Sequence, residues 1–161
     1  MVVQSRSQAV KCINFFNGLT DSELAQVGDI CEEHSLNAGE LCQVEGQSTN
    51  KINFIIKGRV GAVRTTTNLK YCNNEIVLDL LHDGDVFGWS TLIKGTPWST
   101  LRVLDATEVL TADAGKLLNL CETNNHIGYT LMKNLSALIA SRLRQNRISI
   151  LNAIVGMRGE W

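Results

Sequence analysis

The amino-acid sequence predicts a mostly β fold, a sandwich or closed barrel, flanked by helices. From His34 to Thr111, short apolar segments are separated by glycine turns such as NAGE, VEGQ, IKGR and HDGD. Before and after this region, apolar residues recur at helical spacing. Many short strands favour a sandwich or barrel, because these arrangements leave few unpaired strand edges.

Two helices are expected in residues 1–33. The first runs from about Ser5 to Phe16, where the apolar residues recur at helical spacing: Ala9, Val10, Cys12 and Ile13. The second lies in LTDSELAQVGDICEEH, where Thr20 or Asp21 can cap the first amides. Its apolar face is expected to contain Leu24, Val27, Ile30 and Cys31.

The strands are expected in residues 34–113. NFIIKGRVGAV predicts two strands around a turn at Lys57 and Gly58. Further strands are predicted in NEIVLDLL, from Thr100 to Val103, and in EVLTA. We assign this barrel and the helices before and after it to one structural domain.

Helical periodicity returns in residues 114–161, with a long helix from about Asn124 to Ile154. Such a helix outruns the radius of a small domain, so part of its apolar stripe is expected to need a second chain. The predicted homodimer contacts are Leu135, Ile139, Leu143 and Ile150, with Asn146 as a polar residue that fixes the helix register. Alternatively, the barrel covers the whole stripe, and Asn146 marks where the stripe turns toward solvent.

Composition excludes several classes of protein. The chain has 161 residues, with 15 Lys and Arg against 16 Asp and Glu, so it is not basic enough to coat nucleic acid. No apolar run reaches membrane-spanning length and no signal peptide is recognisable, so we expect a cytoplasmic protein that makes no membrane contact. Its 5 cysteines are scattered and never paired as CxxC, which argues against a disulfide framework or a zinc site.

An ordered set of motifs narrows the fold. FFNGLTDSEL, AGE at 38–40, EG at 45–46, FIIKGRV at 54–60, GDVFG at 84–88, TEVL near 108 and SRLR at 141–144 occur in sequence. The set, from about Phe15 to Leu151, resembles the cyclic-nucleotide-binding domain family. The likeness is to bacterial regulators related to the catabolite activator protein and the fumarate and nitrate reduction regulator. It implies an eight-stranded jelly-roll barrel, or double-stranded β-helix, with flanking helices and a phosphate-binding cassette.

The resemblance places the cassette in GDVFGWSTLIKGTPWSTLRV, residues 84–103. Gly88 is expected to let the backbone approach a ligand, and a short helix from about Ser90 to Ile93 to direct its amides at a phosphate. The ligand pocket is expected to contain Gly84, Asp85, Phe87, Gly88, Trp89, Ser90, Thr91, Lys94, Trp98, Ser99 and Arg102.

The side chains depart from the family pattern. Members that bind a cyclic nucleotide carry a glutamate after the FG pair for the ribose and a later arginine for the phosphate. Here these positions hold Trp89 and either Pro97 or Trp98. Each lost charge-assisted contact is worth about 1.5 to 3 kcal/mol, so cyclic AMP or cyclic GMP is expected to bind weakly or not at all.

Substitutes for the lost contacts are conceivable. Lys94 or Arg102 could reach a phosphate and a tryptophan could stack on a base, so a cyclic nucleotide or another small anionic ligand remains a candidate. The alternative is that Lys94 is a solvated turn residue and Arg102 an ordinary strand charge. In that case the tryptophans fill the barrel.

Other chemistries are poorly supported. The 3 histidines, His34, His82 and His126, belong to different elements, which argues against a cupin-type metal site. No nucleophile motif such as GxSxG or HExxH is present, so we interpret the protein as non-enzymatic. Cys12 stands alone near the N-terminus, where iron-sulfur sensors concentrate cysteines. A haem sensor that uses Cys72 and His82 as ligands is an alternative. The simpler interpretation is that Cys72 is a half-buried thiol and His82 a turn histidine.

The resemblance implies a regulatory sensor, and two arrangements are considered. In the first, the protein is free-standing and the long helix converts ligand occupancy into a change of dimer geometry or of a partner-binding face. In the second, it is the sensor half of a transcription regulator with a winged helix-turn-helix. Only VGMRGEW follows Ile154, too short for a DNA-reading domain, so we expect the first arrangement and no direct nucleic-acid binding.

Overall fold

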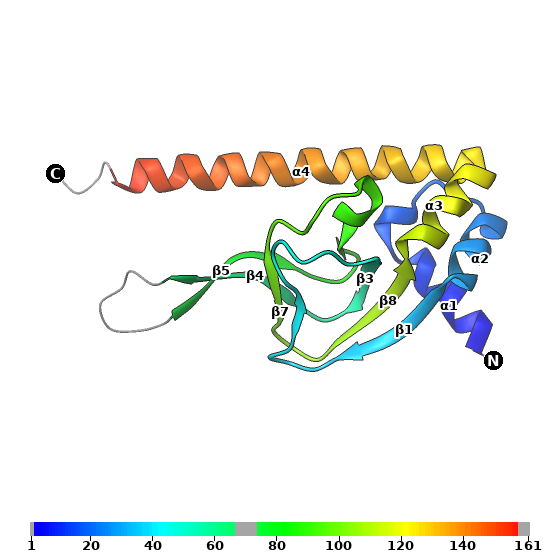
Figure 1. The fold of residues 1–161 in the computed structure, drawn as a ribbon, viewed down its shortest axis with the longest axis horizontal. Coiled ribbons are helices and arrows are strands. Elements are labelled where there is room, and N and C mark those ends of the chain that lie inside the picture. The colour runs from blue at the N-terminus through cyan, green and yellow to red at the C-terminus, as the bar shows by residue number, and fades with distance from the viewer. Residues whose placement is uncertain (1, 67–73, 158–161) are drawn as a thin grey trace.

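The computed structural model describes residues 2–66 and 74–157, shown as a ribbon in Figure 1. In the described part of the chain the helices are α1 (Val2–Lys11), α2 (Asp21–Asp29), α3 (Ala114–Thr123) and α4 (Asn125–Met157), with short 3₁₀ turns η1 (Asn14–Phe16) and η2 (Trp89–Ile93). The strands are β1 (Cys31–Leu36), β2 (Leu41–Gln43), β3 (Lys51–Lys57), β4 (Val60–Thr66), β5 (Asn74–Leu81), β6 (Val86–Phe87), β7 (Thr100–Val103) and β8 (Thr107–Asp113).

These strands form two four-stranded sheets, ordered β1-β8-β3-β6 and β2-β7-β4-β5, with antiparallel pairing. Buried side chains from both sheets pack between them, among them Ile55, Val60, Phe87, Leu101 and Val109. Burying these side chains on both inner faces holds the sheets together. The predicted jelly-roll barrel with flanking helices is confirmed.

The strand pattern was partly visible in the sequence. NEIVLDLL forms β5 over its whole length, and the predictions for β3, β4, β7 and β8 are also confirmed. The strands β1, β2 and β6 were not predicted individually. β2 and β6 have 3 and 2 residues, and β1 is the polar segment CEEHSL, so none shows apolar alternation.

The second helix ends earlier than the sequence pattern indicates. Thr20, one of the two residues predicted to cap it, is its N-cap and forms a capping box with Glu23. The helix stops at Asp29, and Cys31 begins β1 by pairing with Ala112 on β8. The placement of Cys31 on the helix was therefore wrong, because pairing with β8 overrides helical periodicity there. α1 likewise ends at Lys11, before the predicted Phe16.

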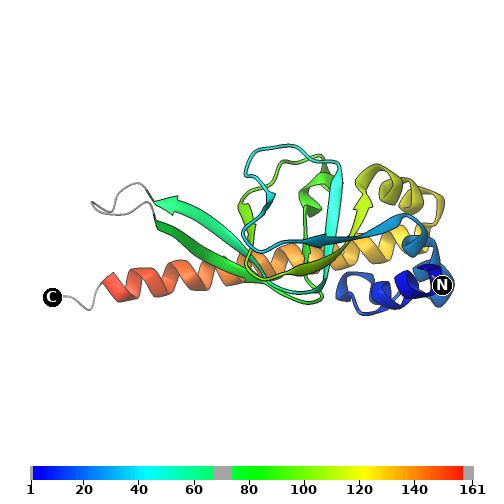
Figure 2. The same ribbon diagram turned by 90° about the horizontal axis from the view of Figure 1, so that it is seen from below.

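Helix α4 has two unlike halves. Its first half packs on the barrel and the N-terminal segments, with Ile127, Leu131 and Leu135 no more than 3% exposed. Its second half extends past the barrel in the same direction as the β4–β5 hairpin (Figures 1 and 2). There Leu143 is 70% exposed and Leu151 is 52% exposed. The barrel therefore covers only part of the apolar stripe.

Candidate functional site

A hollow of about 270 Å³ lies where the cassette, β5 and α4 meet. Six of the predicted cassette residues line it: Phe87, Gly88, Trp89, Ser90, Trp98 and Ser99. Gly84, Asp85, Thr91, Lys94 and Arg102 are not among its lining residues. The structure therefore places about half of the predicted pocket residues around one cavity.

Gly88 has a structural task in addition to any ligand contact. Its φ is +77°, in the left-handed region, and it caps the N-terminus of η2. A Cβ at this position would lie 2.6 Å from the carbonyl oxygen of Lys51 on β3. The close approach that the glycine allows is thus to a neighbouring strand. η2 itself is a 3₁₀ turn of 5 residues, too short for a strong helix dipole.

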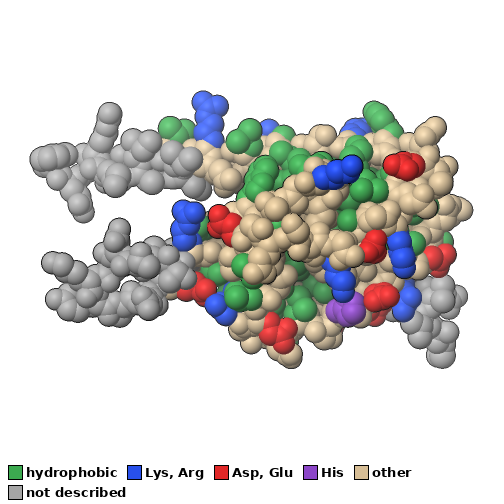
Figure 3. Space-filling model, in the orientation of Figure 1, with side chains coloured by type: hydrophobic (Ala, Val, Ile, Leu, Met, Phe, Trp, Pro, Cys, Tyr) green, Lys and Arg blue, Asp and Glu red, His purple; other side chains and the backbone are tan. Residues whose placement is uncertain are grey.

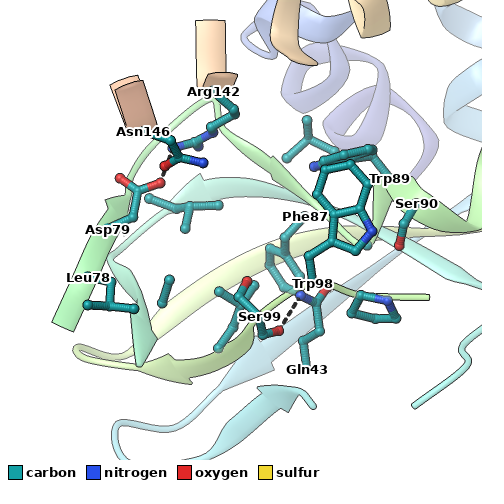
Figure 4. A pocket seen from close by; sticks show the side chains of 16 residues that line it. Gln43, Leu78, Asp79, Phe87, Trp89, Ser90, Trp98, Ser99, Arg142 and Asn146 are labelled. Carbon is teal, nitrogen blue, oxygen red and sulfur yellow. Dashed lines mark hydrogen bonds and ion pairs between the residues drawn. The ribbon is translucent and has the colours of Figure 1, made fainter. Parts of the chain in front are cut away.

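Two tryptophans form one end of the hollow. The rings of Trp89 and Trp98 pack edge to face, with centroids 5.3 Å apart and planes at 81°. Trp89 is partly buried against the core, whereas Trp98 is 69% exposed. Figure 4 shows both near Ser90. Trp89 stands at the first of the two positions where the resemblance leads us to expect a charged group, and the second falls on Pro97 or Trp98. Aromatic surface therefore replaces charge at this end.

An ion pair that the sequence analysis did not predict forms the other end. Arg142 on α4 donates from Nη1 to Oδ2 of Asp79 on β5 at 2.5 Å, and the side chains are 20% and 40% exposed. A second carboxylate is close, because Oδ1 of Asp85 lies 3.9 Å from Nη2 of Arg142. Asn146 lies one helical turn beyond Arg142 and also lines the hollow (Figure 4).

Arg102 is not available to a phosphate. Its guanidinium donates to both carboxylate oxygens of Glu75 on β5, at 2.6 and 2.9 Å. It also donates to the Gly39 carbonyl at 2.6 Å. The hydrogen bonds from Arg102 lower the pKa of the Glu75 carboxyl. The interpretation of Arg102 as an ordinary strand charge is therefore the one that the geometry favours.

Lys94 and Asp85 also do not line the hollow, although Asp85 is close to Arg142. Lys94 is exposed at the C-terminal end of η2, with a left-handed φ of 54°. Gly84 and Asp85 line a smaller neighbouring cavity of about 220 Å³ under α4, together with Asn134. Oδ2 of Asp85 accepts a hydrogen bond from the backbone of His82.

The histidines and cysteines form no metal centre among the described residues. His34, His82 and His126 each pair with a carboxylate, those of Glu32, Asp85 and Glu23. Cys72, which the haem alternative requires, lies outside the described residues. Within the described ranges, no helix combines the length and the apolarity needed to cross a bilayer.

The exposed half of α4 carries an apolar stripe. Hydrophobic side chains reach the surface along this helix (Figure 3). A shallow hollow of about 540 Å³ is lined by Ala140, Leu143, Arg144, Asn146, Arg147 and Leu151. Asn146 thus borders both this stripe and the cassette hollow.

The residues predicted for a dimer are distributed along α4. Leu135 is 3% exposed in the core of its own chain and is not free to meet a partner helix, whereas Ile139 packs against the same core but is only partly buried. Leu143 and Asn146 are exposed. The side chain of Ile150 lies outside the described residues.

Comparisons with known proteins agree on one family. Residues 33–124, more than half of the chain, match the family model of the cyclic nucleotide-binding domain. A candidate cyclic nucleotide-binding protein from Geobacter metallireducens is similar at 25% identity, with a TM-score of 0.71 over 86% of this chain and 98% of that one. No curated protein sequence matches the chain.

Two more distant structures share the fold. A cyclic nucleotide-binding domain from Methylobacillus flagellatus, 16% identical, has a TM-score of 0.75 over 93% of this chain and 83% of that one. The catabolite activator protein of Thermus thermophilus, 23% identical, has a TM-score of 0.67 over 84% of this chain and 61% of that one. At these identities the likeness concerns the fold alone.

Proposed function

Because the chain belongs to the cyclic nucleotide-binding domain family, we propose that it is a non-catalytic sensor whose ligand occupies the cassette hollow and whose output element is α4. One observation carries this proposal. Arg142 and Asn146 of α4 line the same hollow as Trp89 and Trp98 of the cassette. A ligand there contacts the helix directly, so its binding free energy can favour one position of α4 over another.

The ligand is not expected to be an ordinary cyclic nucleotide. The cassette end of the hollow presents Trp89 and Trp98, and the nearby cation Arg102 is engaged by Glu75 and Gly39. Neither of the charged contacts that the family pattern uses for ribose and phosphate is replaced there. We expect cyclic AMP and cyclic GMP to bind weakly or not at all.

The output is proposed to be a homodimer formed by the exposed half of α4. Its apolar stripe, with Leu143 and Leu151, is uncovered by the barrel. Asn146 borders both this stripe and the ligand hollow. A ligand that moves Asn146 therefore changes the surface offered to a second helix. The same output serves a domain that acts alone and one that is the sensor part of a longer DNA-binding regulator.

Native mass spectrometry of protein purified from its own host tests the sensor proposal. We expect a retained small molecule that is lost on mild activation, and slower amide exchange in the second half of α4 when the molecule is present. A clean mass of the chain alone, with amide exchange in α4 that does not change on adding host metabolites, would contradict the proposal and favour a purely structural role.

A further inference from the structure

We propose that the hollow recognises a small organic carboxylate with a flat ring, and that its carboxylate replaces Asp79 as the partner of Arg142. This inference rests on the proposed function, because it names the ligand class of the same cavity. It follows from three features of the described residues: one cation, two nearby carboxylates and an aromatic far end.

The cation is the first feature. Among the described residues that line the hollow, Arg142 alone carries a positive charge. Its side chain is 20% exposed, so its guanidinium is partly desolvated and binds a carboxylate more strongly than a surface arginine does. A guanidinium also offers a planar set of donors that matches a carboxylate. Arg142 is therefore the natural anchor for an acidic ligand.

The present partner of Arg142 can be exchanged. Oδ2 of Asp79 contacts Nη1 of Arg142, Oδ1 accepts a hydrogen bond from the Leu80 amide at 2.9 Å, and the side chain is 40% exposed. On displacement it can turn toward water, where an ionised carboxylate is well solvated. The ligand carboxylate then replaces the negative charge of Asp79 beside Arg142, so the net charge next to the guanidinium does not change. The internal ion pair thus marks the position and the charge of the group that the ligand supplies.

The surrounding charge favours a monoanion over a phosphate. Asp79 and Asp85 approach Arg142 to 2.5 and 3.9 Å, so its single positive charge is already shared by two acidic groups. A dianionic phosphate adds a further negative charge in a partly desolvated site, and like charges at these distances repel strongly. The lining contains no second cation to compensate, within the residues that the structure describes.

The aromatic end of the hollow and its volume indicate the size and shape of the rest of the ligand. Trp89 and Trp98 form an aromatic corner, and Leu81 and Leu101 belong to the apolar lining. A flat ring can pack edge to face or offset against such indoles. The volume of about 270 Å³ lies just below the range of drug-sized ligand sites, about 300 to 1,000 Å³. A single ring with a short acidic side chain suits this space.

Phenylacetate is a suitable probe, with phenylacetamide as its neutral isostere and phenyl phosphate as the dianion. Tryptophan fluorescence and calorimetry are recorded for the whole chain. We expect phenylacetate to bind at least about tenfold more tightly than phenylacetamide, because a charge-assisted contact is lost in the amide. Phenyl phosphate is expected to bind more weakly than phenylacetate.

Three variants test whether the preference for the acid comes from Arg142 itself or only from the net positive charge of the helix. Arg142→Gln is expected to remove the preference for the acid over the amide. Asp79→Asn is expected to tighten phenylacetate binding, because the internal competitor is gone. Lys133→Gln is the control: it removes a positive charge from the same helix at an exposed position that lines neither the cassette hollow nor the hollow on the apolar stripe, and its preference should equal that of the unmodified chain. Circular dichroism of each variant establishes that it is folded.

The outcomes distinguish this inference from the proposed function. Equal binding of acid and amide, or an unchanged preference in Arg142→Gln, overturns the carboxylate assignment but leaves the hollow as a ligand site. If none of the three probes binds at millimolar concentration, the carboxylate assignment is overturned as well. A small molecule retained from the host would still support the sensor proposal in both cases.

Discussion

Arg142 on α4 and Asp79 on β5, 63 residues apart in sequence, are joined by a hydrogen-bonded ion pair of 2.5 Å at the edge of the cassette hollow. The pair links the β4–β5 hairpin to the part of α4 that leaves the barrel. Both side chains are only partly exposed, so solvent screens the pair less than it screens a surface pair.

Breaking this link is expected to loosen α4 rather than unfold the barrel. Asp79→Asn should lower the free energy of unfolding by about 1 kcal/mol, since one partly exposed ion pair is lost. Amide exchange should accelerate in the second half of α4 but not in Ile127 to Leu135, which the core holds. A double-mutant cycle with Arg142→Gln isolates the coupling energy. Additive effects of the two changes would show that the pair contributes nothing.

Cyclic nucleotides provide a second prediction. Calorimetry with cyclic AMP and cyclic GMP should give dissociation constants weaker than micromolar, because the charged anchors of the cassette are absent. The double variant Trp89→Glu and Trp98→Arg should bind cyclic AMP more tightly than the unmodified chain. Position 98 suits the arginine because Trp98 is 69% exposed and its loss should disturb the fold little. Micromolar binding by the unmodified chain would refute the prediction.

The sequence predicted local elements better than the meeting of distant ones. The strand over NEIVLDLL and the helix cap at Thr20 depend mainly on neighbouring residues, and both lie where the sequence pattern indicates them. Asp79 and Arg142 share no local pattern, and their contact depends on which face of α4 lies over β5. The helical spacing of Arg142 and Asn146 places them on one face, but nothing in it indicates that this face meets a cavity.

The sequence leaves Arg102 open as a phosphate ligand for the same reason: its partner is distant in sequence. From the sequence, a cation at the start of a strand after the cassette is a reasonable phosphate ligand. The sheet order β2-β7-β4-β5 brings Glu75 of β5 within 2.6 Å of Arg102 on β7, across the strand β4. Long-range strand order, which a single sequence does not reveal, therefore decides whether this charge is free.

Gly88 allows a test with an internal control. Alanine at this position has to adopt a φ of +77° and place its Cβ 2.6 Å from the Lys51 carbonyl oxygen. Gly88→Ala is expected to lower the free energy of unfolding by about 2 to 4 kcal/mol. Gly46→Ala has nearly the same φ, +75°, but no atom within 4 Å of its Cβ, so it should lose only about 1 kcal/mol. Equal losses in urea denaturation would exclude the steric explanation.

Glu23 should make stability depend on pH. Its carboxylate accepts hydrogen bonds from the Thr20 amide at 2.8 Å and interacts with His126 Nδ1 at 2.8 Å. The Thr20 amide and then His126 lower the pKa of Glu23. A lowered folded-state pKa stabilises the fold above the unfolded pKa of about 4.3, and this stabilisation disappears as the pH falls through the folded-state pKa.

Glu23→Gln keeps the shape and the capping position but cannot ionise. Its deficit in free energy of unfolding relative to the unmodified chain is therefore expected to be largest near neutral pH and to shrink in acid. Urea denaturation at neutral and acidic pH measures both values. Asp29→Asn, in the same helix, serves as a control for a carboxyl without this network. A deficit that is the same at both pH values would contradict the prediction.

The exposed half of α4 should determine the oligomeric state. Leu143 is 70% exposed on the apolar stripe, so Leu143→Glu is expected to convert a dimer into a monomer by placing a charge in the helix contact. Tyr129→Glu is the matched control, because Tyr129 lies in the same helix at 69% exposure but outside the stripe. Light scattering at high micromolar concentration should give a dimer mass for the control and for the unmodified chain. A monomer mass for the unmodified chain would remove the dimer from the mechanism and leave α4 as an output surface for another protein.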